Sequence, residues 1–496
     1  MTTLLAAGAG GRSAPAPFLV VRGHIFHVAG NAGVTSAAEA LVSLPDGALV
    51  IDDAGTIAWV GDHTDLPAAY ADVPVRRADF VLPGFVDAHL HYPQTNALDA
   101  YGGGQLLDWL ERCIFPAEAT LADPDTAERV ADEFVRRRVS AGTTAAMVFG
   151  SAFPEAQDAL FRAHQEAGLR LVSGRGVQTV GPPAAAPLLT GEDEAVRLVA
   201  DEIDRWHLAD TGDPRTARLQ VAVVPRFSLS VTPRTLTALG ELYAGVRDRG
   251  VYFHSHLSEN DRPGDGEVTA VRETYQVTDY LDTYDGRFLP GSTVGGETFL
   301  GRRSVFAHAV HCSDRELARL AETGSSIAHC PTSQQFLGSG TMPWLRTVAA
   351  GITVAAGTDI GGGDEWLIPR VLNDAYKVHL SEPGADSVAL HPAELLFTGT
   401  LAGAQALDLD SRIGNFDVGK DADVVLVEVS GWEPLARSLE FVNCIGDEPL
   451  AADQTLFALL MGVRESAIGA VFVAGHEIES RPVRWRRNRG VHGRPG

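Results

Sequence analysis

Short apolar runs alternate with longer amphipathic segments through the middle of the chain. The segment 125–142 is typical of the amphipathic ones, because its apolar residues recur three and four positions apart and it ends at Gly142, as helices do. Apolar runs separated by such helices indicate βα units and a parallel sheet. Eight apolar runs can be counted, at 85–91, 143–149, 170–177, 219–227, 251–257, 304–311, 325–331 and 353–360. We therefore predict an α/β fold with a (β/α)8 barrel over residues 83–407.

The two ends of the chain differ from the middle, because they carry short β-rich runs separated by Gly, Asp and Pro. Such runs occur at 18–28, 48–52 and 55–61, and similar ones return at 422–429 and 467–475. This pattern indicates strands joined by turns. We expect residues 18–82 and 408–480 to form one small composite β-sandwich, with residues 1–17 and the Arg-rich residues 481–496 as flexible tails.

The composition narrows the choice of partners. The chain has 496 residues with 40 basic against 64 acidic side chains, a formal charge of -24, which argues against binding to nucleic acid or to an anionic membrane. The cysteines are far apart and form no C-x-x-C pair, so a disulfide framework is not expected. The sequence has no convincing signal peptide and no transmembrane run of about 18 apolar residues. We expect a cytoplasmic protein.

Polar residues lie where the predicted strands end, and in a (β/α)8 barrel this edge holds the active site. His89 and His91 share one face of their strand because they are two positions apart. The predicted strand ends carry His89, His91, Arg226, His256, His308 and Asp359. An H-x-H pair with a distant histidine and a carboxylate supplies ligands that suit a catalytic divalent metal with an open position for water.

Other residues compete for these roles. His254 faces the same way as His256, one layer deeper, and we prefer His256 because it is nearer the strand end and Glu259 follows it. The glycines at 361–363 form either a flexible loop or a place where the backbone approaches a ligand closely. The motifs of serine hydrolases, P-loop proteins and Rossmann folds do not occur. Three further histidines are expected to be structural: His311, His329 and His379.

The sequence around the first barrel strand, PGFVDAHLHYPQ (83–94), resembles the amidohydrolase superfamily and, within it, the guanine deaminase family. Residues 413–428 resemble part of the composite β-sandwich that this superfamily builds from both chain ends. The likeness continues along the barrel through VVPRFSLS (223–230), HSHLSEN (254–260), FAHAVHCSDRE (306–316), IAHCPTSQQFLGSG (327–340) and GTDIGGG (357–363).

The resemblance implies a homodimer with one zinc ion per subunit that hydrolyses guanine at C2 to xanthine and ammonia. It implies that Glu259 shuttles protons, that Asp359 accepts the proton of the zinc-activated water, and that His308 lies beside this water. The implied zinc ligands are His89, His91, His256 and Asp359. The implied purine-binding residues are His91, Gln94, Arg226, Phe227, His256, Glu259 and Asp359.

Lys377 and Lys420 are the only lysines, and neither lies on a middle strand of the predicted barrel. Binuclear amidohydrolases usually bridge two metals with a carbamylated lysine of such a strand, so the sequence favours one zinc, and a carboxylate bridge to a second metal stays open. Two departures from the family pattern, Gln334 in place of Asn and a long Gly-rich stretch at 286–301, leave the ring preference open. The alternatives are a deaminase of another aromatic ring, a triazine hydrolase on the same scaffold, or a noncatalytic relative.

Overall fold

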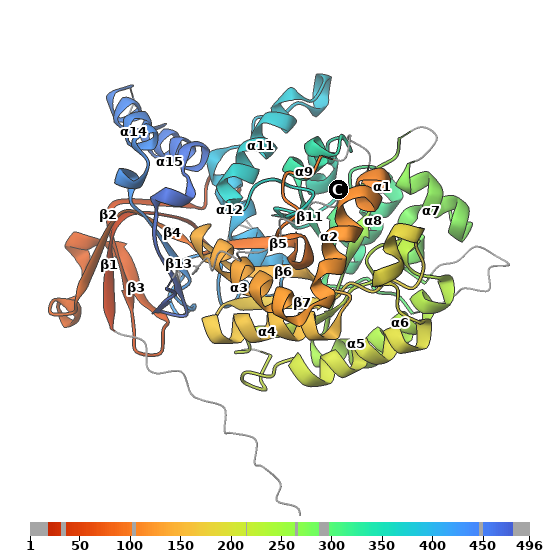
Figure 1. The fold of residues 1–496 in the computed structure, drawn as a ribbon. Helices are drawn as coiled ribbons and strands as arrows, with labels where there is room; N and C mark the ends of the chain where they lie inside the picture. Colours follow the sequence, from red (N-terminus) through yellow and green to blue (C-terminus); the bar gives the residue numbers. More distant parts are fainter. Residues whose placement is uncertain are drawn as a thin grey trace, which may run out of the picture.

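The structure is a computed structural model in which a helix-covered barrel and a separate β-sheet are the two main parts (Figure 1). Both predicted tails, and residues 287–296 of the Gly-rich stretch, lie outside the described residues. The described residues are 18–30, 36–101, 106–214, 216–262, 266–286, 297–445 and 450–479.

Eight parallel strands form the barrel and are hydrogen-bonded in the order in which they follow along the chain. The strands are β5 (Phe85–His91), β6 (Thr143–Gly150), β7 (Arg170–Arg175), β8 (Leu219–Val223), β9 (Tyr252–Leu257), β10 (Ser304–His308), β11 (Ser326–His329) and β12 (Val354–Ala356). Each predicted run coincides with one of them to within one residue or contains it, so the predicted (β/α)8 architecture is confirmed.

The barrel closes where β5 meets the residues that follow β12. The backbone N–H of Asp359 donates to the His89 carbonyl at 2.8 Å. Buried Asp87 accepts hydrogen bonds from the Thr358 N–H at 3.0 Å and from the Thr358 hydroxyl at 2.5 Å. These contacts join segments 271 positions apart in the sequence, and each segment carries candidate metal ligands.

Side chains of the barrel strands alternate between the interior and the surrounding helices, as the two-residue period of a strand requires. Val86, Ala145 and Ala222 belong to a buried cluster inside the barrel, whereas Val148 and Val223 belong to the cluster beneath the helices. The interior is therefore filled with apolar side chains, and polar groups gather at the mouth, where the strands end.

Local signals set where the helices around the barrel begin. Asp123 caps α3 by accepting a hydrogen bond from the Thr126 N–H, and Pro124 occupies the first turn. Ser313 and Glu316 form a capping box at the start of α8. Between β5 and the β domain's late strands the helices are α1 (Leu106–Trp109), a π-helical turn (Leu110–Ile114), α2 (Phe115–Ala119), α3 (Pro124–Ser140), α4 (Pro154–Ala167), α5 (Glu192–Trp206), α6 (Pro233–Val246), α7 (Glu267–Tyr275), α8 (Asp314–Thr323), α9 (Pro331–Phe336), α10 (Trp344–Ala349), α11 (Ile368–Ser381), α12 (Pro392–Gly399) and α13 (Leu401–Ala406).

Both ends of the chain contribute to the second β-sheet, as predicted. Its strands are β1 (Leu19–Val28), β2 (Leu41–Ile51), β3 (Ile57–Asp62), β4 (Val75–Pro83), β13 (Val424–Val427), β14 (Ile468–Val473) and β15 (His476–Glu477). They form one seven-stranded sheet with β3 and β15 at its edges, and Val20 and Val21 cover opposite faces with apolar side chains. The sequence pattern does not predict β4, because the first half of that strand is polar and exposed.

Two helices interrupt the late β segment. α14 (Glu433–Ile445) and α15 (Ala451–Gly462) pack against each other, and α15 also contacts α11 and α12 of the barrel (Figure 1). Asn373 of α11 donates to the Met461 carbonyl at 3.3 Å. The segment 408–480, which we expected to be part of the β domain throughout, therefore includes a helical pair that packs on the barrel.

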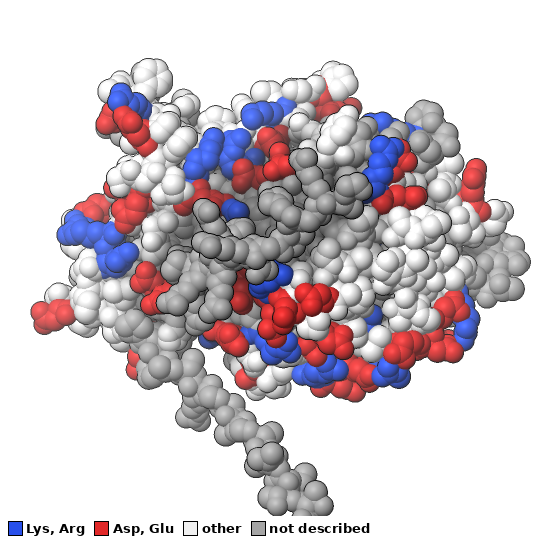
Figure 2. Space-filling model, viewed as in Figure 1, with Lys and Arg blue, Asp and Glu red and all other residues white. Residues whose placement is uncertain are grey.

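Charged side chains of both signs are mixed over the described part of the face shown in Figure 2. Many acids and bases pair within one helix, as Arg197 of α5 does with Glu194 and with Asp201, each at 2.5 Å. In the described part of the chain, no helix combines the length and the apolar character that crossing a membrane requires.

Candidate active site

A β-bulge in β5 places both histidines of the H-x-H motif in the barrel mouth. Ala88 belongs to the interior cluster, whereas Leu90 belongs to the outer one. The register between β5 and β6 shifts between Asp87 and Leu90, where β5 contains one residue more than its partner. This extra residue reverses the alternation, so His89 and His91 follow Ala88 into the interior.

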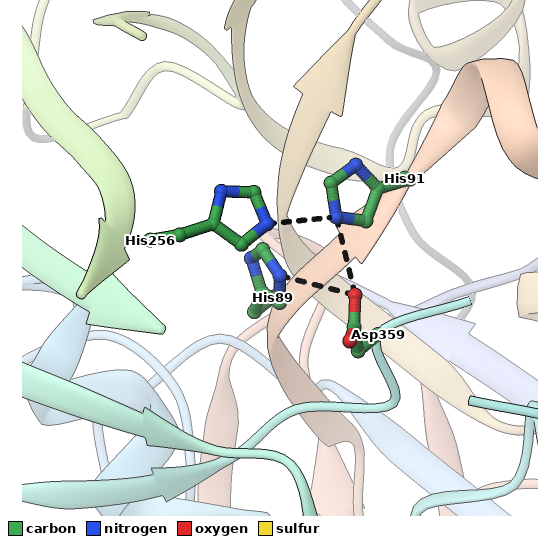
Figure 3. Close-up of side chains that lie close together, drawn as sticks. All are labelled: His89, His91, His256 and Asp359. Atoms are coloured by element: carbon green, nitrogen blue, oxygen red, sulfur yellow. Dashed lines mark hydrogen bonds and ion pairs between the residues drawn. The ribbon is translucent and has the colours of Figure 1, made fainter. Parts of the chain in front are cut away.

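The four predicted metal ligands converge at the mouth (Figure 3). His89 Nε2 and His91 Nε2 lie 3.2 and 3.1 Å from Asp359 Oδ1, and His256 Nε2 lies 3.3 Å from His91 Nε2. One ligand atom of each residue lies within 4.8 Å of the others. The structure thus brings together the residues that the sequence nominated, and His256 rather than His254 belongs to this group.

Hydrogen bonds behind the ligands decide which ring nitrogen faces the centre of the group. His254 Nδ1 donates to the Val305 carbonyl at 2.7 Å, and burial lowers the pKa of His254 well below its ordinary value, so the ring is neutral and its Nε2 must accept. His89 Nδ1, 2.9 Å away, is then the donor. His256 Nδ1 donates to the Arg226 carbonyl at 2.6 Å. In both His89 and His256, Nε2 therefore carries a lone pair toward the centre.

This arrangement fits a divalent metal ion. His89 Nε2 is buried and has no hydrogen-bond partner among the described residues, and an unpaired polar atom in a protein interior is costly. Imidazole nitrogens and a carboxylate oxygen are ligands that zinc prefers. A cation at the centre would give the lone pairs of His89 and His256 a partner and would offset the charge of Asp359.

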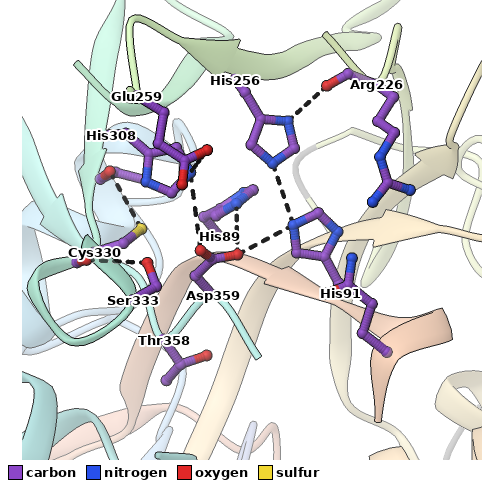
Figure 4. A network of polar contacts seen from close by, with 12 residues as sticks. His89, His91, Arg226, His256, Glu259, His308, Cys330, Ser333, Thr358 and Asp359 are labelled. Atoms are coloured by element: carbon purple, nitrogen blue, oxygen red, sulfur yellow. Dashed lines mark hydrogen bonds and ion pairs between the residues drawn. The ribbon is translucent and has the colours of Figure 1, made fainter. Parts of the chain in front are cut away.

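Left-handed backbone conformations concentrate at the strand ends around the mouth. Ser258, His308, Ala309 and Asp359 have φ values from 48° to 74°. Non-glycine residues in this region store strain, which is typical of functional sites. At His308 the strain has a visible result: Phe306 packs outside the barrel, and alternation would turn His308 outward too, but its ring points into the mouth (Figure 4).

Glu259 and His308 lie beside the candidate metal ligands (Figure 4). His308 Nε2 is 3.4 Å from Glu259 Oε2 and 3.9 Å from Asp359 Oδ2. Burial raises the pKa of Glu259 well above its ordinary value, and the charges of Asp359 and Glu267 add to this effect. Burial also opposes ionisation of Asp359, but His89, His91 and His308 together outweigh this effect and hold the pKa of Asp359 well below its ordinary value. The pocket therefore favours the protonated form of Glu259 and the ionised form of Asp359.

A pocket with about 380 Å³ of empty volume, part of which is open to solvent, opens onto this group. Polar side chains line one wall, and apolar side chains from α1 and the π-helical turn line another. Predicted residues that line the pocket are His91, Gln94, Arg226, Phe227, His256, Glu259 and Asp359. Residues that the sequence analysis missed are Leu106, Trp109, Leu110, Glu267 and Leu337, and Gly362 belongs to the glycine run that it left open.

Glu118 of α2 joins two of the predicted recognition residues. Its carboxylate accepts hydrogen bonds from Arg226 Nη1 at 2.8 and 2.6 Å and from Gln94 Nε2 at 2.9 Å. All three side chains are buried. The sequence analysis missed Glu118, because a single glutamate in a short apolar segment carries no signal of spacing or periodicity.

The histidines expected to be structural have partners away from the pocket. His329 and His379 meet through their Nε2 atoms at 3.0 Å, and His311 Nε2 lies 2.9 Å from the Ser339 carbonyl. Gln334, the departure from the family pattern, is buried in α9 and its Nε2 lies 3.5 Å from the His308 carbonyl. It therefore lies behind the strained turn that directs His308 into the mouth.

The glycines that follow Asp359 make room for neighbouring side chains. A Cβ atom on Gly361, whose φ is +110°, would lie 1.9 Å from Gln94 Oε1. A Cβ atom on Gly362 would lie 2.9 Å from Asp359 Oδ2. The backbone of these glycines therefore approaches side chains that line the pocket, and its approach to a ligand stays a prediction.

Neither lysine lies at the mouth. Lys377 is on α11, 3.7 Å from Asp374, and Lys420 donates to the Ile413 carbonyl at 3.3 Å. A second group of potential ligands, made of Glu259, His308 and Asp359, shares Asp359 with the first group. A bridge between two metals would therefore have to use this carboxylate.

Comparisons with known proteins agree with the geometry. The model of the amidohydrolase family matches residues 80–454. The chain is 40% identical to a probable guanine deaminase of Deinococcus radiodurans over 89% of this chain and 96% of that protein, and 34% identical to the guanine deaminase of Escherichia coli K12 over 90% and 93%. The crystal structure of a guanine deaminase from Bradyrhizobium japonicum superposes with a TM-score of 0.81 at 27% identity, covering 94% of this chain and all of that one.

Proposed function

Because the chain belongs to the amidohydrolase family, we propose that it catalyses the zinc-dependent hydrolytic deamination of guanine to xanthine and ammonia. Relatives that are 40% and 34% identical over most of the chain carry the name guanine deaminase. The observation that carries the proposal is the convergence of four metal-ligand candidates and a protonated glutamate on one pocket. Water would add to C2 of the purine, and the bond from C2 to the exocyclic amine would break.

We assign one zinc ion per chain to His89, His91, His256 and Asp359. When bound, zinc lowers the pKa of water to about 7, so that a strong nucleophile is available at neutral pH. The chain's own contribution is to hold three imidazoles and one carboxylate in place. The bulge in β5 orients His89 and His91. The hydrogen bonds that His89 Nδ1 and His256 Nδ1 donate fix the tautomers of these two rings.

Glu259 is suited to move protons. Burial and the charge of Asp359 both oppose ionisation of its carboxyl group, so its protonated form is favoured. In the proposed reaction it protonates the ring nitrogen next to C2, then takes up the proton that the attacking water has lost and delivers it to the amine, which leaves as ammonia. A carboxyl group that changes state in this way acts as both general acid and general base.

Asp359 and His308 complete the proton path. Asp359 is ionised, so it can accept the proton that the attacking water loses. His308 lies between the two carboxyl groups, within 3.4 Å of Glu259 and 3.9 Å of Asp359, and burial lowers its pKa to about 3. It is therefore neutral, and it can orient the water and stabilise the oxygen on the tetrahedral carbon through a hydrogen bond.

The wall of the pocket opposite the metal group would bind the purine. Arg226 offers a planar set of donors suited to the O6 carbonyl, and Gln94 lies beside it on the same carboxylate. Phe227 forms an apolar wall together with Leu106 and Trp109. A flat ring with polar edges fits such a pocket.

Ammonia release from a panel of ring substrates tests the proposal. We expect zinc-loaded protein to release ammonia from guanine faster than from 8-oxoguanine, adenine, cytosine or aminotriazines. If another ring released ammonia faster, that ring would be assigned as the substrate. The protein would then be a different deaminase or a triazine hydrolase. Purified protein without zinc and without activity would support the noncatalytic alternative.

Metal analysis and sedimentation test the remaining parts of the proposal. We propose one zinc per chain in a cytoplasmic homodimer. Two zinc ions per chain would indicate that Asp359 bridges a second metal held by Glu259 and His308. A mass in solution equal to one chain would exclude the homodimer.

A further inference from the structure

One buried carboxylate outside the pocket lining contacts both residues that would read the polar edge of the purine. Glu118 Oε1 accepts from Gln94 Nε2 at 2.9 Å and from Arg226 Nη1 at 2.8 Å, and Glu118 Oε2 accepts from the same Nη1 at 2.6 Å. Glu118 is 3% exposed and does not line the pocket, whereas Gln94 and Arg226 do. It therefore lies behind the recognition residues and cannot touch a ligand itself.

Glu118 decides which end of the Gln94 amide faces the ligand. A carboxylate paired with arginine only accepts hydrogen bonds, so the amide nitrogen of Gln94 must point at Glu118. The amide oxygen then points the other way, and it is buried with no hydrogen-bond partner among the described residues. It lies so close to Gly361 that a Cβ there would come within 1.9 Å. Gln94 therefore presents an acceptor.

Glu118 also holds the guanidinium of Arg226. Both hydrogen bonds between them use Nη1, which leaves the other N–H groups of the guanidinium as donors. The guanidinium carbon of Arg226 also lies over the Phe115 ring, 5.4 Å from the ring centroid, and this contact helps to fix the position of the guanidinium. Arg226 therefore presents a donor next to the acceptor of Gln94.

We propose that Glu118 is a positioning residue that sets the order of donor and acceptor at the recognition wall, so that the site selects rings with a lactam edge. A lactam edge carries a carbonyl acceptor next to a ring N–H donor, as C6=O and N1–H do in guanine, hypoxanthine and xanthine. Adenine and 2,6-diaminopurine carry the reverse order, an amino donor next to a ring-nitrogen acceptor. This inference rests on the proposed function and adds the residue that defines the substrate class.

The reverse order would leave two buried groups without partners. The Gln94 oxygen would face a ring-nitrogen lone pair, and the Arg226 donors would face an amino group. Sites built to hydrogen-bond a substrate group reject analogues that lack it by large factors, because their own polar groups then stay unpaired. The fixed carboxylate prevents the Gln94 amide from turning over to accommodate the wrong ring.

Binding of hypoxanthine and adenine reports the preference for a lactam edge. Neither purine has an amino group at C2, so neither is deaminated there. We expect calorimetry with the zinc-loaded wild type to show hypoxanthine binding more tightly than adenine. In Glu118→Gln the new amide can donate to Gln94, so the Gln94 amide can turn over and present its NH2 group. The ratio of hypoxanthine to adenine affinity should then fall about 10- to 100-fold, and Glu118→Asp, which keeps an acceptor only, should retain more of the ratio.

A double variant separates positioning from a general loss of structure. If Glu118 acts through Arg226 and Gln94, then adding Glu118→Gln to Arg226→Ala should raise the KM for guanine by less than Glu118→Gln raises it in the wild type, because only the contact with Gln94 remains. Glu202→Gln, a buried glutamate next to Arg175 on the outside of the barrel, serves as the matched control and should leave the ratio at its wild-type value.

The possible outcomes separate this inference from the proposed function. An unchanged hypoxanthine-to-adenine ratio in Glu118→Gln, or a KM effect that adds fully to that of Arg226→Ala, would overturn the role of Glu118. An equal fall of the ratio in Glu202→Gln would overturn it as well. If the wild type releases no ammonia from guanine, the proposed function fails, and the binding ratio still tests the edge that the pocket selects.

Discussion

The base and the mouth of the barrel differ in how their buried polar side chains are paired. At the base, the first residue of β7, Arg170, donates to Asp423 at 2.9 Å and to Asp421 at 2.6 Å. The two aspartates lead into β13, so this buried ion-pair network ties the barrel to the β domain. Asp423 also accepts from the Ala474 N–H at 2.8 Å, and both of its oxygens are therefore used.

At the mouth, buried polar atoms lack partners. His89 Nε2, Glu259 Oε1, Gln94 Oε1 and both ring nitrogens of His308 have no hydrogen bond among the described residues. The backbone at His308 and Asp359 is left-handed as well. A protein tolerates such costs where a ligand completes the arrangement. At the base, Arg170 Nη1 also has no hydrogen bond among the described residues, but no group of potential metal ligands surrounds it. The comparison indicates that the base contributes stability and the mouth contributes chemistry.

The largest expected effect is the loss of turnover in Glu259→Gln at the mouth. The amide has nearly the same shape but cannot pass protons, so kcat should fall about 10³-fold, equivalent to about 4 kcal/mol of barrier. Zinc content and the free energy of unfolding should stay near wild type, because Glu259 is not among the metal ligands. Steady-state kinetics with metal analysis checks both, and near-normal kcat in this variant would remove the proton-shuttle role.

The next largest effect should come from the base, through Arg170→Met. Removing one partner of a buried ion-pair network leaves uncompensated carboxylates in the interior, so the free energy of unfolding should fall by about 3 kcal/mol. The kcat per folded molecule should not change. Arg162→Met, which breaks an exposed pair with Glu128 at 3.6 Å, is the control and should cost well under about 1 kcal/mol. A large loss of kcat in folded Arg170→Met would break the division between the two ends.

Much of the barrel could be predicted from the sequence, because its strands are buried on both faces and appear as apolar runs. The residues at the mouth could be predicted in position but not in orientation. His89 and His91 face inward only because of a bulge, and His308 only because of a left-handed turn. Neither feature leaves a mark in the spacing of apolar residues.

Partners that come from distant segments escaped the sequence analysis. Glu118 is 108 positions from Arg226, and nothing in the local pattern around either residue indicates the pair. The same holds for Asp423 and Arg170 at the base, which are 253 positions apart. The polar half of β4 and the helices α14 and α15 were missed for a related reason, since long-range packing rather than local pattern determines them.

The third prediction concerns His254, which lies deeper in the barrel than the candidate metal ligands, and its effect on zinc affinity. His254 lies below the candidate metal ligands and accepts the hydrogen bond that fixes the tautomer of His89. His254→Phe should lower zinc affinity about 10- to 100-fold, about 1.4 to 2.7 kcal/mol, because partners behind a ligand tune its binding to that extent. Competition with a chelating dye measures this affinity. His164→Phe, a buried histidine of α4, is the control, and an equal loss there would show that His254 acts only through packing.

The smallest expected effect is a change in how stability depends on pH, and it again separates the mouth from the base. Glu267 lines the pocket, and burial raises its pKa to about 7. Between pH 4.5 and 7 the unfolded chain ionises this group while the folded chain keeps it protonated, so stability is full below pH 4.5 and falls as pH rises toward 7. Glu267→Gln removes this loss. From pH 6 to pH 7 the wild type should lose about 1 kcal/mol more than the variant, as measured by urea unfolding at fixed total zinc.

Tyr280→Phe gives the matched test of the sign of this pH dependence. The Tyr280 hydroxyl donates to Glu267 Oε1 at 2.6 Å and lowers the pKa of Glu267 against the effect of burial. Without that donor the pKa should rise further, so the pH-dependent loss of stability should extend above pH 7 in Tyr280→Phe and be absent in Glu267→Gln. If both variants kept the wild-type slope, the burial of Glu267 would not contribute to the pH dependence of stability. The contrast with the paired aspartates at the base would then concern geometry alone.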